Sequence, residues 1–164
     1  MRIGLRIPPC APVGQIADLA HDAECAGFDE VWFPDSQLLW RDVFAVAAAA
    51  AEATTRITLG TAVTNFATRH PSVVASSART VTEIAPGRFV LGVGVGDSAV
   101  GPVGLRQSTG ARCERGSRWC GIFLPAGTWT LPEHGRGSAT PPRCRSIWRR
   151  AGRAISGWQG RWRT

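Results

Sequence analysis

The chain has 164 residues, of which 44% are hydrophobic, and a formal net charge of +7. This length suffices for one domain with a sizeable core. Because no apolar run reaches membrane-spanning length and the start lacks a long apolar segment, we expect a cytoplasmic protein with no membrane partner. The five cysteines are odd in number and include no CxxC pair, which argues against a disulfide framework.

The charge is divided unevenly along the chain. Residues 1–105 contain seven Arg against ten Asp and Glu, whereas residues 106–164 contain twelve Arg against two Glu. The second part also holds five of the seven Trp and no sustained apolar period. We therefore expect residues 1–106 to form the domain that carries the function, and residues 107–164 to be an irregular, disordered tail.

Strand and helix patterns alternate within residues 1–106. The patterns predict strands at 2–8, 28–33, 56–63 and 87–95, with helices between them at about 16–23, 43–53 and 71–85. Gly27 can end the first helix in a left-handed conformation, Asp42 can cap the second, and Pro71 suits the first turn of the third. Four strands alternating with three helices indicate an α/β fold with a parallel sheet.

Polar residues at the ends of the strands favour a barrel over an open, doubly wound sheet. An open sheet usually has its glycine fingerprint after the first strand, where this chain has Pro8-Pro9-Cys10. The glycines at 92, 94 and 96 are spaced GxGxG, but strand glycines more often mark close backbone approach than a dinucleotide site. In a barrel, the carboxyl ends of the strands carry the site. Three polar pairs stand there: Asp35 and Ser36, Thr64 and Asn65, Asp97 and Ser98.

Three segments of this domain carry a family resemblance. They are AGFDEVWFPDS at 26–36, ITLGTAVTNFATRHP at 57–71 and ARTVTEIAPGRFVLGVGVGDS at 78–98. In this order and spacing they resemble the bacterial luciferase-like (β/α)8 barrels, and among these the branch that includes methylenetetrahydromethanopterin reductase. The resemblance implies the N-terminal half of a TIM barrel.

The resemblance also implies an oxidoreductase or monooxygenase. In this family, hydride passes between a flavin or deazaflavin ring and a small organic substrate bound above it. Coenzyme F420 is the cofactor implied here, and FMN is the close alternative. Full-length relatives are expected to be homo-oligomers.

Site residues follow from the same resemblance. Asp35 matches an acidic residue that can approach the ring or substrate, and it is the candidate catalytic residue. Ser36 stands where several relatives have His, which puts His-dependent proton transfer in doubt. A cis peptide bond found in many members would fall between Ala62 and Val63. The candidate cofactor contacts are Gly60, Thr61, Ala62, Val63, Asn65, Asp97 and Ser98, and no metal is expected.

The residues alone allow simpler interpretations of these positions. Residues 60–63 fit an ordinary buried strand. Asn65, Asp97 and Ser98 fit solvated loops. His70, before a proline at a helix start, fits a capping or packing role.

The tail admits three interpretations. Its Arg and Trp residues could bind nucleic acid through phosphate contacts and stacking, without sequence preference. Zinc ligation by the tail is not indicated, because its candidate ligands lie too far apart in the sequence: Cys113, Cys120, His134 and Cys144. A wrong reading frame fits better, because GC-rich DNA read out of frame yields Arg, Gly, Pro, Ser, Trp and Cys in excess.

When the codons for residues 112–130 are read in a shifted frame, they can encode a helical pattern. Those for residues 148–164 can encode a strand with a glycine loop in the same frame. Both elements then follow the order that the family requires. We therefore favour a frameshift near residues 106–108, followed by a non-homologous tail. The chain would then be a truncated barrel that is inactive as it stands. A basic, non-enzymatic protein that binds nucleic acid through the tail is the alternative.

Overall fold

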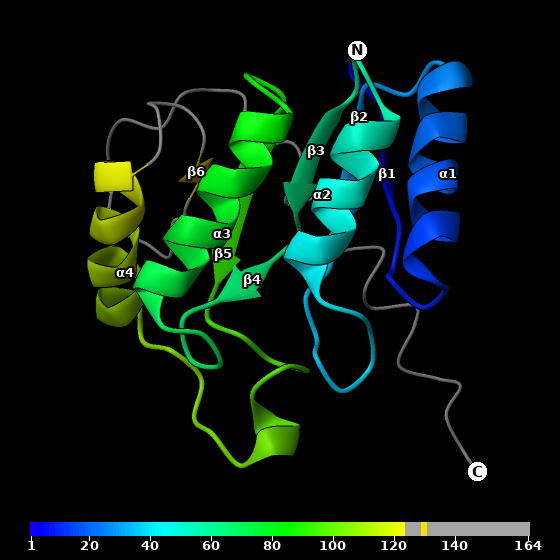
Figure 1. Ribbon diagram of the computed structural model, residues 1–164. Helices are drawn as coiled ribbons and strands as arrows, with labels where there is room; N and C mark the ends of the chain where they lie inside the picture. The colour runs from blue at the N-terminus through cyan, green and yellow to red at the C-terminus, as the bar shows by residue number, and fades with distance from the viewer. Residues whose placement is uncertain (124–128, 131–164) are drawn as a thin grey trace, which may run out of the picture. The chain divides into compact units, whose positions relative to one another are not determined.

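A computed structural model describes residues 1–123 and 129–130 of the chain (Figure 1). Strands and helices alternate through most of it. In chain order the elements are β1 (Gly4–Arg6), α1 (Val13–Cys25), β2 (Glu30–Phe33), α2 (Val43–Ala53), β3 (Thr58–Thr61), β4 (Thr64–Asn65), α3 (Pro71–Ile84), β5 (Phe89–Gly94), the short 3-10 helix η1 (Gly101–Val103), α4 (Gly110–Phe123) and β6 (Trp129–Thr130).

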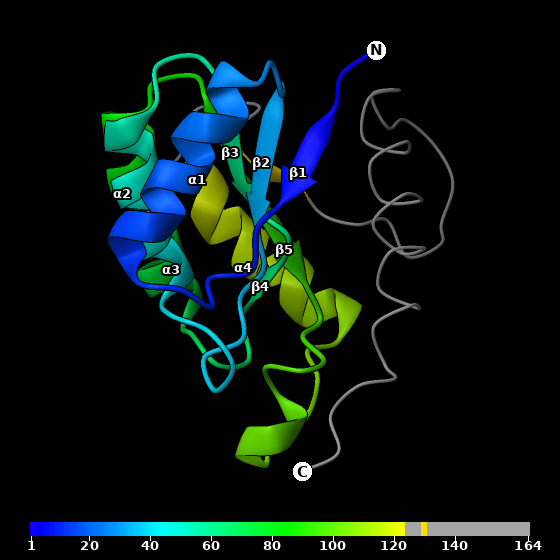
Figure 2. The ribbon, with the colours of Figure 1, turned by 90° about the vertical axis from the view of Figure 1, so that its right-hand side faces the viewer.

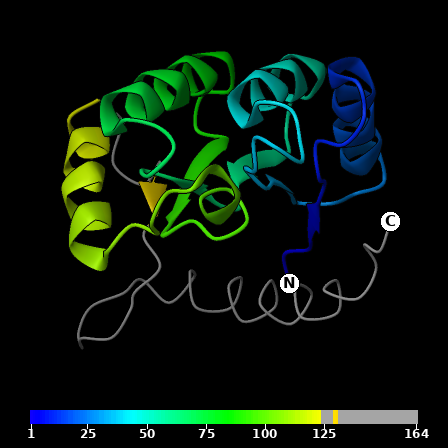
Figure 3. The ribbon, with the colours of Figure 1, turned by 90° about the horizontal axis from the view of Figure 1, so that it is seen from below.

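The strands form one parallel sheet in the order β1-β2-β3-β5-β4, and β6 pairs with β5. Figure 2 shows α1, α2 and α3 on one side of this sheet, and Figure 3 shows α1 to α4 following one another in an arc around it. We call the opposite side of the sheet the inner face. The predicted α/β fold with a parallel sheet is confirmed.

Local signals set the ends of the helices as the sequence predicted. Gly27 follows α1 with a φ of 88°, a conformation that glycine adopts without steric cost. The Asp42 side chain accepts hydrogen bonds from two backbone amides of the first turn of α2. His70 caps α3 through its side chain, and Pro71 is the first residue of that helix.

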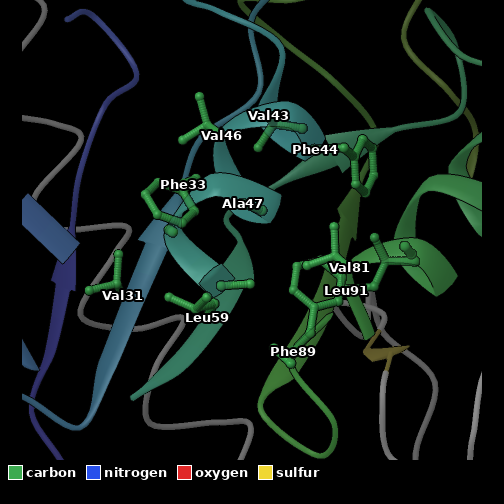
Figure 4. Close-up of a cluster of buried hydrophobic side chains, with 14 of the residues drawn as sticks. Val31, Phe33, Val43, Phe44, Val46, Ala47, Leu59, Val81, Phe89 and Leu91 are labelled. Carbon is green, nitrogen blue, oxygen red and sulfur yellow. The ribbon is translucent and has the colours of Figure 1, made fainter. Parts of the chain in front are cut away.

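The core lies between the sheet and the helices (Figure 4). Alternate strand residues such as Val31, Phe33 and Leu59 are fully buried against Val43 and other residues of α2. Leu5, which pairs with Val31, is 36% exposed because β1 is an edge strand with a neighbour on one side only. Among the described residues, no helix is both long and apolar enough to cross a membrane.

Helix α4 extends the regular structure beyond residue 106, into the first part of the segment expected to form an irregular tail. It packs against α3, and its buried residues recur at i, i+3, i+4 and i+7: Cys113, Gly116, Ser117 and Cys120. Gly116 lies against the Phe66 ring, where a Cβ atom would overlap the ring. The rest of the expected tail, including His134 and Cys144, lies outside the described residues except for β6.

Candidate functional site

The predicted site residues come together at the carboxyl end of the sheet. Asp35 follows β2, Asn65 ends β4, and Asp97 and Ser98 follow β5. The loops that carry them lie at the lower end of the sheet in Figure 1, where the strand arrows point. This is the end at which parallel β/α proteins carry their sites.

A bulge interrupts the third predicted strand at this end. Gly60 pairs with Val90, and Thr64 pairs with Val93. Three residues, 61–63, therefore stand opposite two residues of β5, so one residue is extra. The peptide bond between Ala62 and Val63 is cis, as the family resemblance predicted.

Two glycines of β5 make room for the bulge on the inner face. A Cβ atom on Gly92 would overlap the carbonyl oxygen of Thr61, and one on Gly94 would lie 2.7 Å from Val63 Cγ2. The GxGxG spacing therefore marks close backbone approach, as predicted. Both bulge residues, Ala62 and Val63, remain partly exposed.

Thr61 does not offer its hydroxyl group to a ligand. Its side chain is fully buried, and Thr61 Oγ1 donates to the Gly92 carbonyl at 2.8 Å and accepts from the Gly92 amide at 2.9 Å. Gly60 is also buried, because the Trp32 indole lies where a Cβ atom of residue 60 would be. This contact between neighbouring strands could not be predicted from the sequence, because Trp32 and Gly60 belong to different elements.

The Asp35 carboxylate is engaged on both oxygens. Its side chain is 1% exposed, Thr64 Oγ1 donates to Oδ2 at 2.7 Å, and Arg69 donates to both oxygens at 3.3 Å. Arg69 also contacts Asp42 Oδ2 at 2.8 Å. Burial alone would lower the pKa of Arg69, but hydrogen bonds and charge attraction from the two carboxylates raise it. Sequence reasoning missed Arg69, because its partners lie far away along the chain.

Hydrogen bonds tie the loop after β2 to the loop after β5. Ser36 Oγ donates to the Ser98 carbonyl at 3.1 Å, and Gln37 Nε2 donates to the Ala99 carbonyl at 2.7 Å. Ser36 therefore joins two loops at this end of the sheet. Asp97 and Ser98 are themselves exposed.

Asn65 is a turn residue in this arrangement. Its Oδ1 accepts hydrogen bonds from the backbone amides of Ala67 and Thr68, both at 2.9 Å, and the residue is 1% exposed. Such bonds are typical of an Asx turn. The carbonyl oxygen of the Asn65 side chain therefore shapes the loop that leads to Arg69.

The site thus consists of the partly exposed bulge residues Ala62 and Val63, with Val63 beside Gly92 and Gly94. The side chains of Asp35, Thr61 and Asn65 nearby are engaged in hydrogen bonds within the protein. Within the described part of the chain, no three potential metal ligands of the His, Cys, Asp or Glu type come together. Such a small apolar surface suits contact with a flat ring better than acid-base chemistry by clustered side chains.

Comparisons with known proteins agree with this description. Residues 1–116 match the model of the luciferase-like monooxygenase family, and the chain belongs to this family. The match extends past residue 106, where the resemblance was expected to end.

Several relatives are similar to this chain. The 5,10-methylenetetrahydromethanopterin reductase of Methanolobus tindarius is 42% identical over 99 residues, which cover 60% of this chain and 30% of the relative. An F420-dependent glucose-6-phosphate dehydrogenase of Kineococcus radiotolerans is 39% identical over 93 residues, which cover 52% of this chain and 28% of the relative.

Among solved structures, the coenzyme F420-dependent tetrahydromethanopterin reductase of Methanopyrus kandleri has a TM-score of 0.60 and 34% identity to this chain. The match covers 63% of this chain and 30% of that structure. The chain therefore spans less than a third of the length of these relatives.

Proposed function

We propose that this chain contributes the ring-binding part of an F420-dependent oxidoreductase that transfers hydride between the cofactor and a small organic substrate. The observation that carries the proposal is the bulge at Ala62 and Val63. It projects over the inner face at the carboxyl end of the sheet, where Gly92 and Gly94 have no side chains that would block it.

The residues present fit a flat ring. Ala62 and Val63 are small and partly exposed, so they can contact a ring over its width. When bound, coenzyme F420 supplies the carbon that gives or takes the hydride. The chain's own contribution is to hold the ring at the bulge and to keep the loops with Asp97 and Ser98 beside it through Ser36 and Gln37.

Asp35 was the candidate catalytic residue, and its contacts favour a different role. Both of its oxygens are engaged by Arg69 and Thr64, and the side chain is buried. A carboxylate that exchanges protons with a substrate needs a free oxygen within reach of that substrate. We therefore propose that Asp35 holds the loop behind the bulge.

Coenzyme F420 is favoured over FMN because two of the relatives named above are F420-dependent, at 39% and 34% identity. The whole reaction requires parts of the barrel that this chain, at less than a third of the relatives' length, does not span. We propose that a frameshift near residues 106–108 replaced them and that the uninterrupted protein forms homo-oligomers.

Cofactor titration tests these proposals. Coenzyme F420 and FMN would each be titrated into the 164-residue chain and into a protein that continues residues 1–106 in the shifted frame. The continued protein should bind F420 more tightly than FMN, and the 164-residue chain should bind it weakly. Tight binding by the 164-residue chain would refute the truncation, and preference for FMN would refute the choice of cofactor.

A further inference from the structure

The hydroxyl group of Thr61 takes the place of two backbone hydrogen bonds that are missing between β3 and β5. In a regular parallel ladder, the Gly92 amide would donate to a carbonyl oxygen of β3, and the Gly92 carbonyl would accept from an amide of β3. The extra residue at 61–63 removes these partners, because the Thr61 carbonyl oxygen turns onto the inner face over Gly92.

The Thr61 side chain pairs with both groups of Gly92. Thr61 Oγ1 accepts from the Gly92 amide at 2.9 Å and donates to the Gly92 carbonyl at 2.8 Å. A hydroxyl group is suited to this task, since it has one donor and two acceptor positions. Gly92 is buried in β5, so without Thr61 both of its backbone groups would lack a partner away from water.

From these contacts we propose that Thr61 is a positioning residue for the ring-binding bulge, rather than a cofactor contact. Its hydroxyl group holds β3 against β5 at the residue just before Ala62. The Ala62 amide is held on the other side by the Phe33 carbonyl at 2.8 Å. The residues that begin the bulge are thus held to β2 on one side and to β5 on the other.

The proposal rests on the proposed function in one respect, namely that the ring bound at the bulge is that of coenzyme F420. It requires a hydroxyl group at position 61. Thr61→Ser keeps that group and loses a methyl group, whereas Thr61→Val keeps the shape and loses the hydroxyl group. The two variants therefore separate positioning through the hydroxyl from packing of the side chain.

Amide hydrogen exchange followed by NMR on the full 164-residue chain is the first measurement. The Gly92 amide should be protected in the unsubstituted chain and in Thr61→Ser. In Thr61→Val it should exchange at least about tenfold faster, with shifted resonances for Ala62 and Val63. An unprotected Gly92 amide in the unsubstituted chain, or equal protection in Thr61→Val, would overturn the proposal.

F420 titration of the frame-continued protein is the second measurement. Thr61→Val should weaken binding at least about tenfold, while Thr61→Ser should stay within about threefold of the unsubstituted protein. Equal losses in both variants would indicate packing alone and would overturn the positioning role. If the unsubstituted protein binds no F420, the proposed function fails, and the exchange measurement still decides the role of Thr61.

Discussion

Removing Arg69 should destabilise the chain far more than removing its exposed partner. Arg69 lies between Asp35, whose side chain is 1% exposed, and Asp42, whose side chain is 46% exposed. Truncating one partner of a buried ion pair leaves the other charge buried and typically costs about 3 to 5 kcal/mol. The Thr64 hydroxyl group still satisfies one oxygen of Asp35, so we expect about 3 kcal/mol for Arg69→Met.

Two further variants separate the two ion pairs. Asp42→Asn loses an exposed pair but can still cap α2, so it should cost less than about 1 kcal/mol. In an Asp35→Asn background the buried carboxylate that pairs with Arg69 is absent, and Arg69→Met should then cost about 1 kcal/mol. Urea denaturation followed by circular dichroism gives each free energy of unfolding.

The reasoning would be wrong if Arg69→Met cost no more than Asp42→Asn. It would also be wrong if Asp35→Asn left the cost of Arg69→Met unchanged. Should Arg69→Met fail to fold alone, the double variant with Asp35→Asn should recover the fold, because it lacks the uncompensated carboxylate.

Three further predictions concern pH, thiols and nucleic acid. Burial raises the pKa of Glu24, but hydrogen bonds from the backbone amides of residues 55–57 lower it overall. Its contribution to stability should therefore be full above the ordinary carboxyl pKa and lost as the pH falls from there through the lowered pKa of the folded state, and Glu24→Gln should flatten this loss in urea midpoints measured against pH. Burial raises the pKa of the Cys120 thiol to about 11, so iodoacetamide at about pH 8 should alkylate it at least tenfold more slowly than the exposed Cys10, and equal rates would contradict the packing of α4. If nucleic acid binds the Arg-rich residues 106–164, it should bind without sequence preference and more weakly as salt rises, which fluorescence anisotropy with unrelated oligonucleotides can check.

The fold was predictable where one short pattern decides the outcome. Helix α2 begins and ends where its Ala-rich stretch and the Asp42 cap predicted. Helix α4 was missed because its buried stripe consists of Cys, Gly and Ser, which a search for large apolar residues does not detect. Its packing depends on close approach, as at Gly116, which is a tertiary property.

The site was only partly predictable for a related reason. Family resemblance located the bulge at Ala62 and Val63, and the glycine spacing pointed to close approach. The roles of Thr61 and Arg69 depend on pairings with residues 31 and 34 positions away along the chain. Sequence patterns within one element carry no information on such pairings, so the hydrogen bonds of Asp35 and Thr61 could not be predicted from them.

The central claim is that the bulge at Ala62 and Val63 binds the cofactor ring. F420 titration of the frame-continued protein, compared with its Ala62→Trp and Ala45→Trp variants, tests it most directly. Ala45 lies exposed on α2, so Trp there controls for the effect of a large side chain as such. We expect Ala45→Trp to bind F420 as the unsubstituted protein does and Ala62→Trp to lose binding because the indole fills the space of the ring. Unchanged binding in Ala62→Trp would contradict the claim.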